Sequence, residues 1–154
     1  MTLRSGQDGG DVEELTGDEV LAMPVRLHGI ELGRPVDLLL DREAFRVVGL
    51  DVRCGDEVHR FLPLPTAGIA DGALTIHSPL VMLEADQLAF YRSRSFSLAS
   101  LKRRPVTRKG RNVGLLRDIV FLRDGKLAAV LLDGGERVPF DGTLAFAPQS
   151  RSAA

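Results

Sequence analysis

The side chains best suited to metal binding in this sequence are three histidines and one cysteine. His28, His59 and His77 are separated by 31 and 18 residues, and Cys54 lies in a predicted turn. Metal sites usually draw two ligands from one short segment, and no such pair of His or Cys residues occurs here. Neither a Gly-x-Ser-x-Gly nucleophile motif nor a glycine-rich phosphate loop is present in the sequence. We therefore expect no metal, no cofactor and no enzymatic activity.

Charged residues are segregated along the chain. No acid occurs between Gln87 and Arg117, and the bases of this basic span are Arg92, Arg94, Lys102, Arg103, Arg104, Arg108, Lys109, Arg111 and Arg117. The first eight are the candidate partner-binding residues. Conversely, residues 8–19 hold acids and no base, namely Asp8, Asp11, Glu13, Glu14, Asp18 and Glu19.

Two interpretations of this charge pattern remain open. The basic span is either a solvated linker and strand edge, or a contact for an anionic partner such as RNA. The acidic, glycine-rich tail is expected to be disordered. It would then be able to fold back over the basic span and compete with such a partner.

An aspartate stands at the start of an apolar run in two places. Asp37 and Asp118 each follow a glycine by four residues, after Gly33 and Gly114 respectively. Such a carboxylate is either a ligand or catalytic group, or a structural group that accepts backbone N–H bonds or pairs with an arginine such as Arg117. Because the pattern occurs twice, we favour the structural interpretation. The glycines are then expected to mark a bulge or a close approach of strands.

These aspartates belong to an internal repeat. A separation of 81 residues relates Pro24-Val25 to Pro105-Val106, Gly33 to Gly114, and Asp37 to Asp118. The sequences DGALTI (71–76) and DGTLAF (141–146) also correspond, at a shorter separation because the first copy has a longer turn. The predicted organisation is an acidic disordered tail (1–19), a first unit (20–79), a connecting segment (80–97), a second unit (98–148) and a disordered C-terminus (149–154).

Each unit contains short runs of Val, Leu, Ile and Phe bounded by turn residues, which is typical of β-strands. Asp124-Gly125 is the strongest hairpin signal, because both residues tolerate the positive φ that a two-residue turn requires. The predicted strands are 24–28, 34–41, 45–53, 58–64 and 73–77 in the first unit, and 105–108, 114–123, 126–132, 136–140 and 143–147 in the second. In the connecting segment we expect a short helix near 84–92.

The predicted fold class is all-β, with two small antiparallel β-barrel units in tandem. Barrel closure would remove the exposed strand edges that invite aggregation. The strand centres at 38–40 and 119–121 are apolar on both faces. One face would fill the barrel, and the other requires a cover from either the partner unit or a second chain, as in a homodimer.

Residues 98–140 resemble a PRC-barrel domain. The features that carry the resemblance are Leu101-x-x-x-Pro105-Val106, Val113-Gly114, Asp118-Ile119-Val120, Asp124-Gly125 and Val138-Pro139-Phe140. The first unit matches more loosely, through Pro24-Val25, Leu32-Gly33, Asp37 and Leu62-Pro63-Leu64. The family includes a photosynthetic reaction-centre subunit and the C-terminal domain of a ribosome maturation factor. The resemblance implies a small PRC-type barrel that docks onto protein or ribonucleoprotein partners.

The chain departs from both relatives. It has no apolar segment of about 20 residues that would span a membrane, and a second barrel-like unit stands where the maturation factor has a different domain. The expected function is therefore a non-enzymatic adaptor that docks onto a protein or ribonucleoprotein assembly. Alternatives are direct RNA binding through residues 92–117, or a small-ligand or enzymatic domain. The single Cys54 excludes an intramolecular disulfide, which favours a cytoplasmic location.

Overall fold

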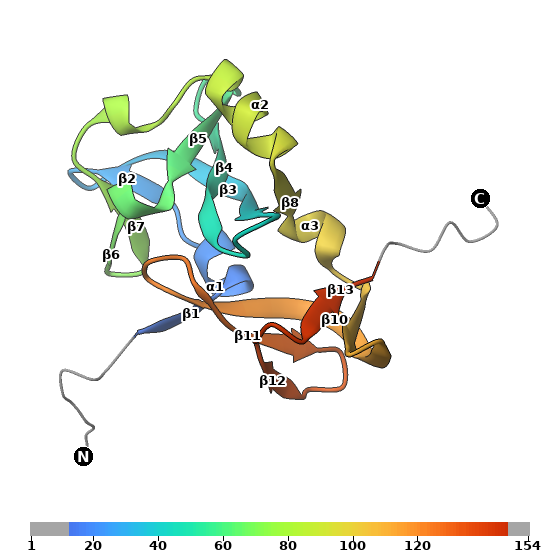
Figure 1. Ribbon diagram of the computed structural model, residues 1–154. Helices are drawn as coiled ribbons and strands as arrows, with labels where there is room; N and C mark the ends of the chain where they lie inside the picture. The colour runs from blue at the N-terminus through green and yellow to red at the C-terminus, as the bar shows by residue number, and fades with distance from the viewer. Residues whose placement is uncertain (1–12, 148–154) are drawn as a thin grey trace, which may run out of the picture.

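The computed structural model describes residues 13–147, which form a mostly β structure with 53% strand and 18% helix (Figure 1). The strands are β1 (Glu14–Thr16), β2 (Val25–Leu27), β3 (Ile30–Asp41), β4 (Val47–Cys54), β5 (His59–Pro63), β6 (Gly68–Ala70), β7 (Ala73–Ile76), β8 (Ser95–Ser97), β9 (Pro105–Arg108), β10 (Arg111–Leu122), β11 (Leu127–Leu132), β12 (Arg137–Pro139) and β13 (Leu144–Phe146). The helices are α1 (Gly17–Leu21), α2 (Ala85–Ser93) and α3 (Leu98–Leu101), with short 3-10 turns η1 (Leu64–Thr66) and η2 (Pro79–Val81). The predicted helix near 84–92 is α2.

The strands form two sheets, each built mainly from one repeat. The first sheet has the order β5-β4-β3-β2-β7-β6, with β8 also paired to β3, and the second has the order β12-β11-β10-β9-β13, with β1 also paired to β10. No closed barrel is formed by the part of the chain that the structure describes, so the predicted barrel closure is not observed.

The prediction of purely antiparallel sheets is also wrong at one place. Strands β2 and β7 are parallel, whereas β9 and β13 of the second repeat are antiparallel. The first repeat carries an extra strand, β6, which was not predicted and which forms a hairpin with β7. That hairpin reverses the chain once more before it reaches β2. As a result, β7 runs parallel to β2, whereas β13 runs antiparallel to β9.

The 81-residue correspondence extends outward to β1 and β8, so in the structure the two repeats begin at Glu14 and Ser95. The repeats exchange these first elements. β1, at the start of the first repeat, pairs with β10 of the second, and β8 pairs with β3 of the first. The registers of these two strand pairs correspond. Thr16 is opposite Val120, and Ser97 is opposite Leu39. Ser97 lies 81 positions after Thr16, and Leu39 lies 81 positions before Val120. Figure 1 shows β1 in blue beside β10 in orange.

This exchange corrects the prediction of a disordered acidic tail for residues 13–19. Residues 14–16 form β1, and α1 begins at Gly17 with a capping box between Thr16 and Glu19. Strand pairing and an ion pair of 2.8 Å from Glu14 to Arg137 hold the segment against the second repeat. The rest of the predicted tail, residues 1–12, and the predicted C-terminal segment 149–154 lie outside the described residues.

The two repeated aspartates bind the exchanged helices. Asp118 Oδ2 accepts a hydrogen bond from the backbone N of Asp18 in α1 (3.1 Å), and its Oδ1 accepts from its neighbour Ile119 N (2.8 Å). Asp37 Oδ1 accepts from the backbone N of Ala99 in α3 (3.2 Å), 81 positions after Asp18, and Asp37 Oδ2 accepts from the Ser97 hydroxyl. Each carboxylate therefore fixes the first turn of the helix that the other repeat contributes.

Both repeats share one hydrophobic core. It contains side chains from the first sheet such as Leu38 and Leu50, and side chains from the second such as Ile119 and Val130. The exchanged helices contribute to it as well, because Val20 of α1, Leu98 of α3 and Leu101 of α3 are almost completely buried. The second apolar face of the strands is thus covered by the partner repeat. Within residues 13–147 no helix is long and apolar enough to cross a membrane.

The predicted hairpin at Asp124-Gly125 connects β10 to β11 and also touches the other repeat. Gly125 has φ +95°, and its carbonyl oxygen accepts a hydrogen bond from Val47 N at 2.8 Å. Close approach also explains Gly33, where an added Cβ would lie 2.7 Å from the Arg53 carbonyl oxygen. At Gly114, φ is +143° beside a register shift in the β9–β10 pair.

Replacing Gly125 with Val should destabilise the protein by about 2–4 kcal/mol, because a β-branched residue resists positive φ and the new side chain meets backbone. An added Cβ would lie 2.3 Å from the Val47 carbonyl oxygen. Ala44→Val, in the exposed turn at the corresponding place of the first repeat, should change stability by about 0.5 kcal/mol or less. Urea denaturation measures both, and equal losses would contradict the role of this turn.

Replacing Asp118 with Asn should alter the pH dependence of stability. Burial raises the pKa of the Asp118 carboxyl, against the opposing effect of its two backbone N–H donors. A carboxyl with a raised folded pKa stabilises the fold fully below its unfolded pKa of about 3.9, and this contribution is lost as the pH rises through the folded value. The unfolding free energy of the wild type relative to Asp118→Asn should therefore decrease between about pH 3 and pH 7.

The matched control for loss of one carboxylate is Asp124→Asn, since the Asp124 side chain is 62% exposed. The measurement is a series of urea titrations across the pH range. A wild-type advantage over Asp118→Asn that stays constant with pH would contradict the raised pKa.

Candidate functional site

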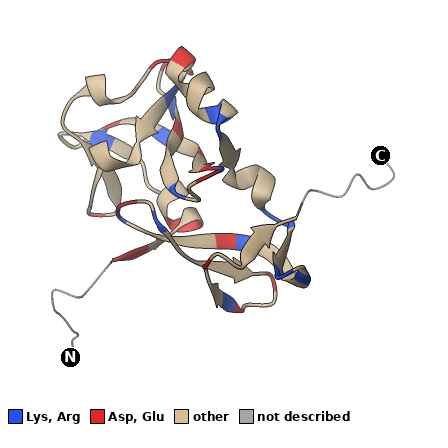
Figure 2. Cartoon of the chain, in the orientation of Figure 1, with Lys and Arg blue, Asp and Glu red and all other residues tan. Residues whose placement is uncertain are grey.

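The basic span is divided between the two repeats. Arg92 lies in α2 and Arg94 caps that helix, so both lie over the first sheet. The remaining candidate residues follow α3 or lie in β9, β10 and their hairpin: Lys102, Arg103, Arg104, Arg108, Lys109 and Arg111. Figure 2 shows these two groups of blue segments on different parts of the molecule.

Several of these bases have partners within the chain. Lys102 Nζ lies 2.6 Å from Asp18 Oδ1, and Arg108 Nη2 lies 3.9 Å from Asp141 Oδ2. The Arg94 guanidinium stacks 4.5 Å from the centre of the Phe90 ring. The Arg103, Lys109 and Arg111 side chains are exposed, whereas Arg104 is half-buried.

Arg92 takes part in a polar cluster that the sequence did not indicate. It pairs with Asp51 Oδ2, and the other oxygen of that carboxylate lies 2.8 Å from His59 Nδ1. The Asp51 side chain is 1% exposed, while those of His59 and Arg92 are 45% and 42% exposed. A buried carboxylate is costly unless it is paired, so the two cationic or hydrogen-bonding partners stabilise it.

This cluster occurs in only one repeat. Asp51 lies opposite Asp37 on the neighbouring strand, and the residue in the same place opposite Asp118 is Leu131. The fold therefore does not require a carboxylate at this position. The cluster helps to hold α2 on the outer face of the first sheet, where the Tyr91 ring stacks on Phe61 with centroids 4.2 Å apart.

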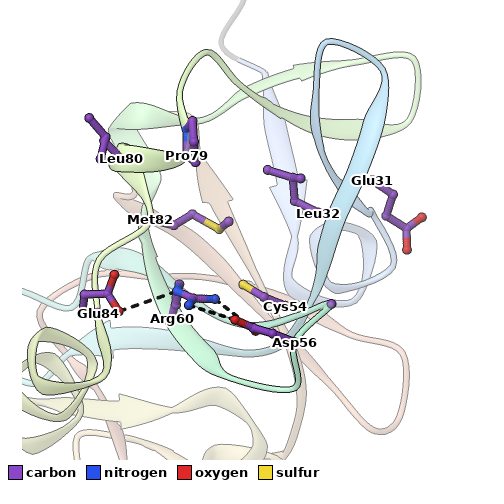
Figure 3. Close-up of a pocket in the computed structure, with 10 residues that line it drawn as sticks. Glu31, Leu32, Cys54, Asp56, Arg60, Pro79, Leu80, Met82 and Glu84 are labelled. Carbon is purple, nitrogen blue, oxygen red and sulfur yellow. Dashed lines mark hydrogen bonds and ion pairs between the residues drawn. The ribbon is translucent and has the colours of Figure 1, made fainter.

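A groove of about 530 Å³ opens between the β4–β5 turn and η2 (Figure 3). Its apolar lining comes from Leu32 of β3, Pro79 and Leu80 of η2, and Met82. Leu80 is 85% exposed, which is the highest value among the large apolar side chains of residues 13–147. Ser78 caps η2 by accepting a hydrogen bond from Leu80 N at 3.1 Å, so Leu80 is presented by a fixed turn.

Arg60 crosses one end of this groove between two carboxylates. Its Nη2 lies 3.0 Å from Asp56 Oδ2, and its Nε lies 3.7 Å from Glu84 Oε1, as Figure 3 shows. The hydrogen bonds that Arg60 donates to the Asp56 carboxylate raise the pKa of its guanidinium. Hydrogen bonding from Arg60 in turn lowers the pKa of the Asp56 carboxyl. The Asp56–Arg60 ion pair therefore stays charged over a wider pH range than the two isolated groups would.

His28, His59 and His77 do not form a metal-ligand group with Cys54. In residues 13–147 no group of three or more His, Cys, Asp or Glu side chains is arranged to hold a metal ion. His59 instead uses Nδ1 to bind Asp51. The available sequence signal for that cluster was Asp51, an aspartate within a predicted apolar strand. Its partners His59 and Arg92 lie 8 and 41 residues away in the chain, so the spacing did not point to them.

Comparison of the chain with models of known protein families gave no match, and a search of curated proteins found no relative. The PRC-barrel resemblance thus rests on the motifs quoted above.

Removing the guanidinium of Arg92 should destabilise the protein, because Asp51 would keep a single partner for its buried charge. We expect Arg92→Ala to lower the free energy of unfolding by about 1–3 kcal/mol. Adding Asp51→Leu, the residue type found at Leu131 in the other repeat, should recover part of that loss because no buried charge remains.

Arg94→Ala is the matched control, since it removes an arginine from the same helix end without touching Asp51. Urea denaturation of the wild type and these three variants gives the comparison. If Arg92→Ala and Arg94→Ala lose the same stability, the Asp51 cluster does not hold α2.

Proposed function

We propose that this chain is a non-enzymatic docking protein that binds a segment of a partner within a protein or ribonucleoprotein assembly. The observation that carries the proposal is the groove with Leu80 at its rim. A leucine that is 85% exposed, next to further apolar lining, is typical of a protein-binding surface. The PRC-barrel resemblance supports the same class of function.

The chemistry of the groove favours one kind of occupant. Leu32, Leu80 and Met82 would receive an apolar side chain. The charged lining residues are Glu31, Asp56, Glu84 and Arg60, so acids outnumber bases. We therefore propose an extended peptide segment with an apolar residue flanked by lysine or arginine. Because η2 fixes the backbone at Leu80 before binding, little loop entropy would be lost on docking.

Direct RNA binding is the second candidate function. It is favoured by Lys109 and Arg111, which are exposed together in the β9–β10 hairpin beside Arg108 (Figure 2). Contacts to phosphates would make the affinity fall steeply with salt. A filter-binding assay with bulk cellular RNA at two salt concentrations tests this candidate.

The docking proposal is tested by NMR titration of the full chain with two synthetic heptapeptides, one with leucines flanked by lysines and one with the same leucines flanked by glutamates. The lysine peptide should shift the backbone amides of Leu32, Leu80 and Met82. Leu80→Asp should weaken its binding about tenfold, the effect of roughly 1.4 kcal/mol. Ile30→Asp is the matched control, because Ile30 is 67% exposed and does not line the groove.

Equal binding of both peptides would contradict the charge preference, and an unaltered affinity in Leu80→Asp would contradict the groove as the docking site. Binding of the RNA alone, with shifts confined to the β9–β10 hairpin, would favour the second candidate.

A further inference from the structure

A second cavity lies where α1, the end of α3 and β10 meet. It has a volume of about 390 Å³ and is lined by Asp18, Lys102, Arg103, Leu115, Leu116, Arg117 and Asp133. This volume is within the range of roughly 300–1,000 Å³ typical of small-molecule sites. The lining combines two leucines with five charged groups, so the cavity offers both an apolar and an ionic surface.

Cations outnumber acids in this lining. Lys102, Arg103 and Arg117 face two carboxylates, Asp18 and Asp133. Lys102 is paired with Asp18 at 2.6 Å. Within residues 13–147, neither Arg103 nor Arg117 has a carboxylate at ion-pair distance. Two guanidinium groups are thus left to face an anionic ligand.

The other repeat provides an internal comparison for these charges. The residues 81 positions before Lys102, Arg103 and Arg117 are Leu21, Ala22 and Val36. The same elements, a short helix followed by a turn and a long strand, are built there without any of the three cations. The fold therefore does not demand positive charge at these positions.

The backbone also differs at one of these positions. Arg103 has φ +73°, in the left-handed region that non-glycine residues rarely adopt, whereas its counterpart Ala22 has φ −85°. The conformation is held by a hydrogen bond from Arg103 N to the Leu116 carbonyl oxygen at 2.7 Å. Such strain costs of order 1 kcal/mol and tends to occur at functional sites. Here it coincides with the repeat that carries the cationic cavity.

We propose that this cavity binds a small phosphate ester. The phosphate group would contact Lys102, Arg103 and Arg117, because guanidinium groups match the geometry of phosphate oxygens. The uncharged body of the ligand would lie against Leu115 and Leu116. The Asp18 carboxylate forms an ion pair with Lys102, so it competes with the phosphate for the Lys102 ammonium group. This site is separate from the docking groove, which lies on the other repeat.

The test is an NMR titration of the full chain with phenyl phosphate, with benzoate as the matched carboxylate probe. Phenyl phosphate should shift the amides of Arg103, Leu116 and Arg117, and benzoate should bind more weakly. Arg103→Gly should weaken phenyl phosphate binding about tenfold through loss of a charge-assisted contact. This variant accepts the positive φ, so it removes the cation while relieving backbone strain.

Two further variants complete the test. Asp18→Asn should tighten phenyl phosphate binding, by about threefold or more, because it releases Lys102 while keeping the backbone N–H that binds Asp118. Arg111→Ala is the matched control, since Arg111 is exposed at the far end of β10 and does not line the cavity. Its affinity for phenyl phosphate should equal that of the wild type.

An RNA of about ten nucleotides without terminal phosphates distinguishes a free ester from a polymer phosphate. The proposal is overturned by three results: no phenyl phosphate binding at about 20 mM, equal affinity in Arg103→Gly and wild type, or binding of the RNA with no binding of phenyl phosphate. A failure here leaves the heptapeptide titration of the groove unaffected.

Discussion

The exchange of the first strand and helix between the two repeats is the constraint on which the rest of the structure depends. It is fixed by two buried carboxylates, Asp37 and Asp118, which accept N–H bonds from the first turn of α3 and of α1. A buried carboxylate without such donors would be costly. Each aspartate accepts one N–H bond from its own strand and another from the helix of the other repeat, so neither sheet alone supplies all of its donors. The two sheets consequently share one core rather than folding as separate barrels.

Comparison of the two repeats distinguishes residues that the fold requires from residues that are needed for another role. Asp37 and Asp118 occur in both repeats and make corresponding contacts. Asp51, in contrast, is replaced by Leu131 in the second repeat. The same backbone thus tolerates a buried ion cluster in one copy and an apolar side chain in the other. A polar group that only one copy carries is the better candidate for a specific role.

The two repeats present different surfaces. The first presents an apolar groove with Leu80 at its rim and an arginine held between two carboxylates. The second presents a cationic cavity and the exposed bases of the β9–β10 hairpin. Opposite charge preferences on the two halves suit a protein that contacts more than one partner, which agrees with the proposed role in an assembly. The shared core keeps both surfaces in a fixed relation.

The sequence by itself determined most of the strands, the helix near 84–92, and the correspondence of Asp37 and Asp118 in the two repeats. Those depend on local information: apolar periodicity, Asp-Gly turn chemistry and a constant separation of 81 residues. Only the tertiary structure decided that β1 and β8 cross to the opposite repeat, that β2 and β7 run parallel, and that Asp51 is buried beneath Arg92. β1 and β8 have three residues each, too few for a periodic signal. Their stability comes from burial against segments about 60 to 100 residues away, and that free energy has no local signature in the chain.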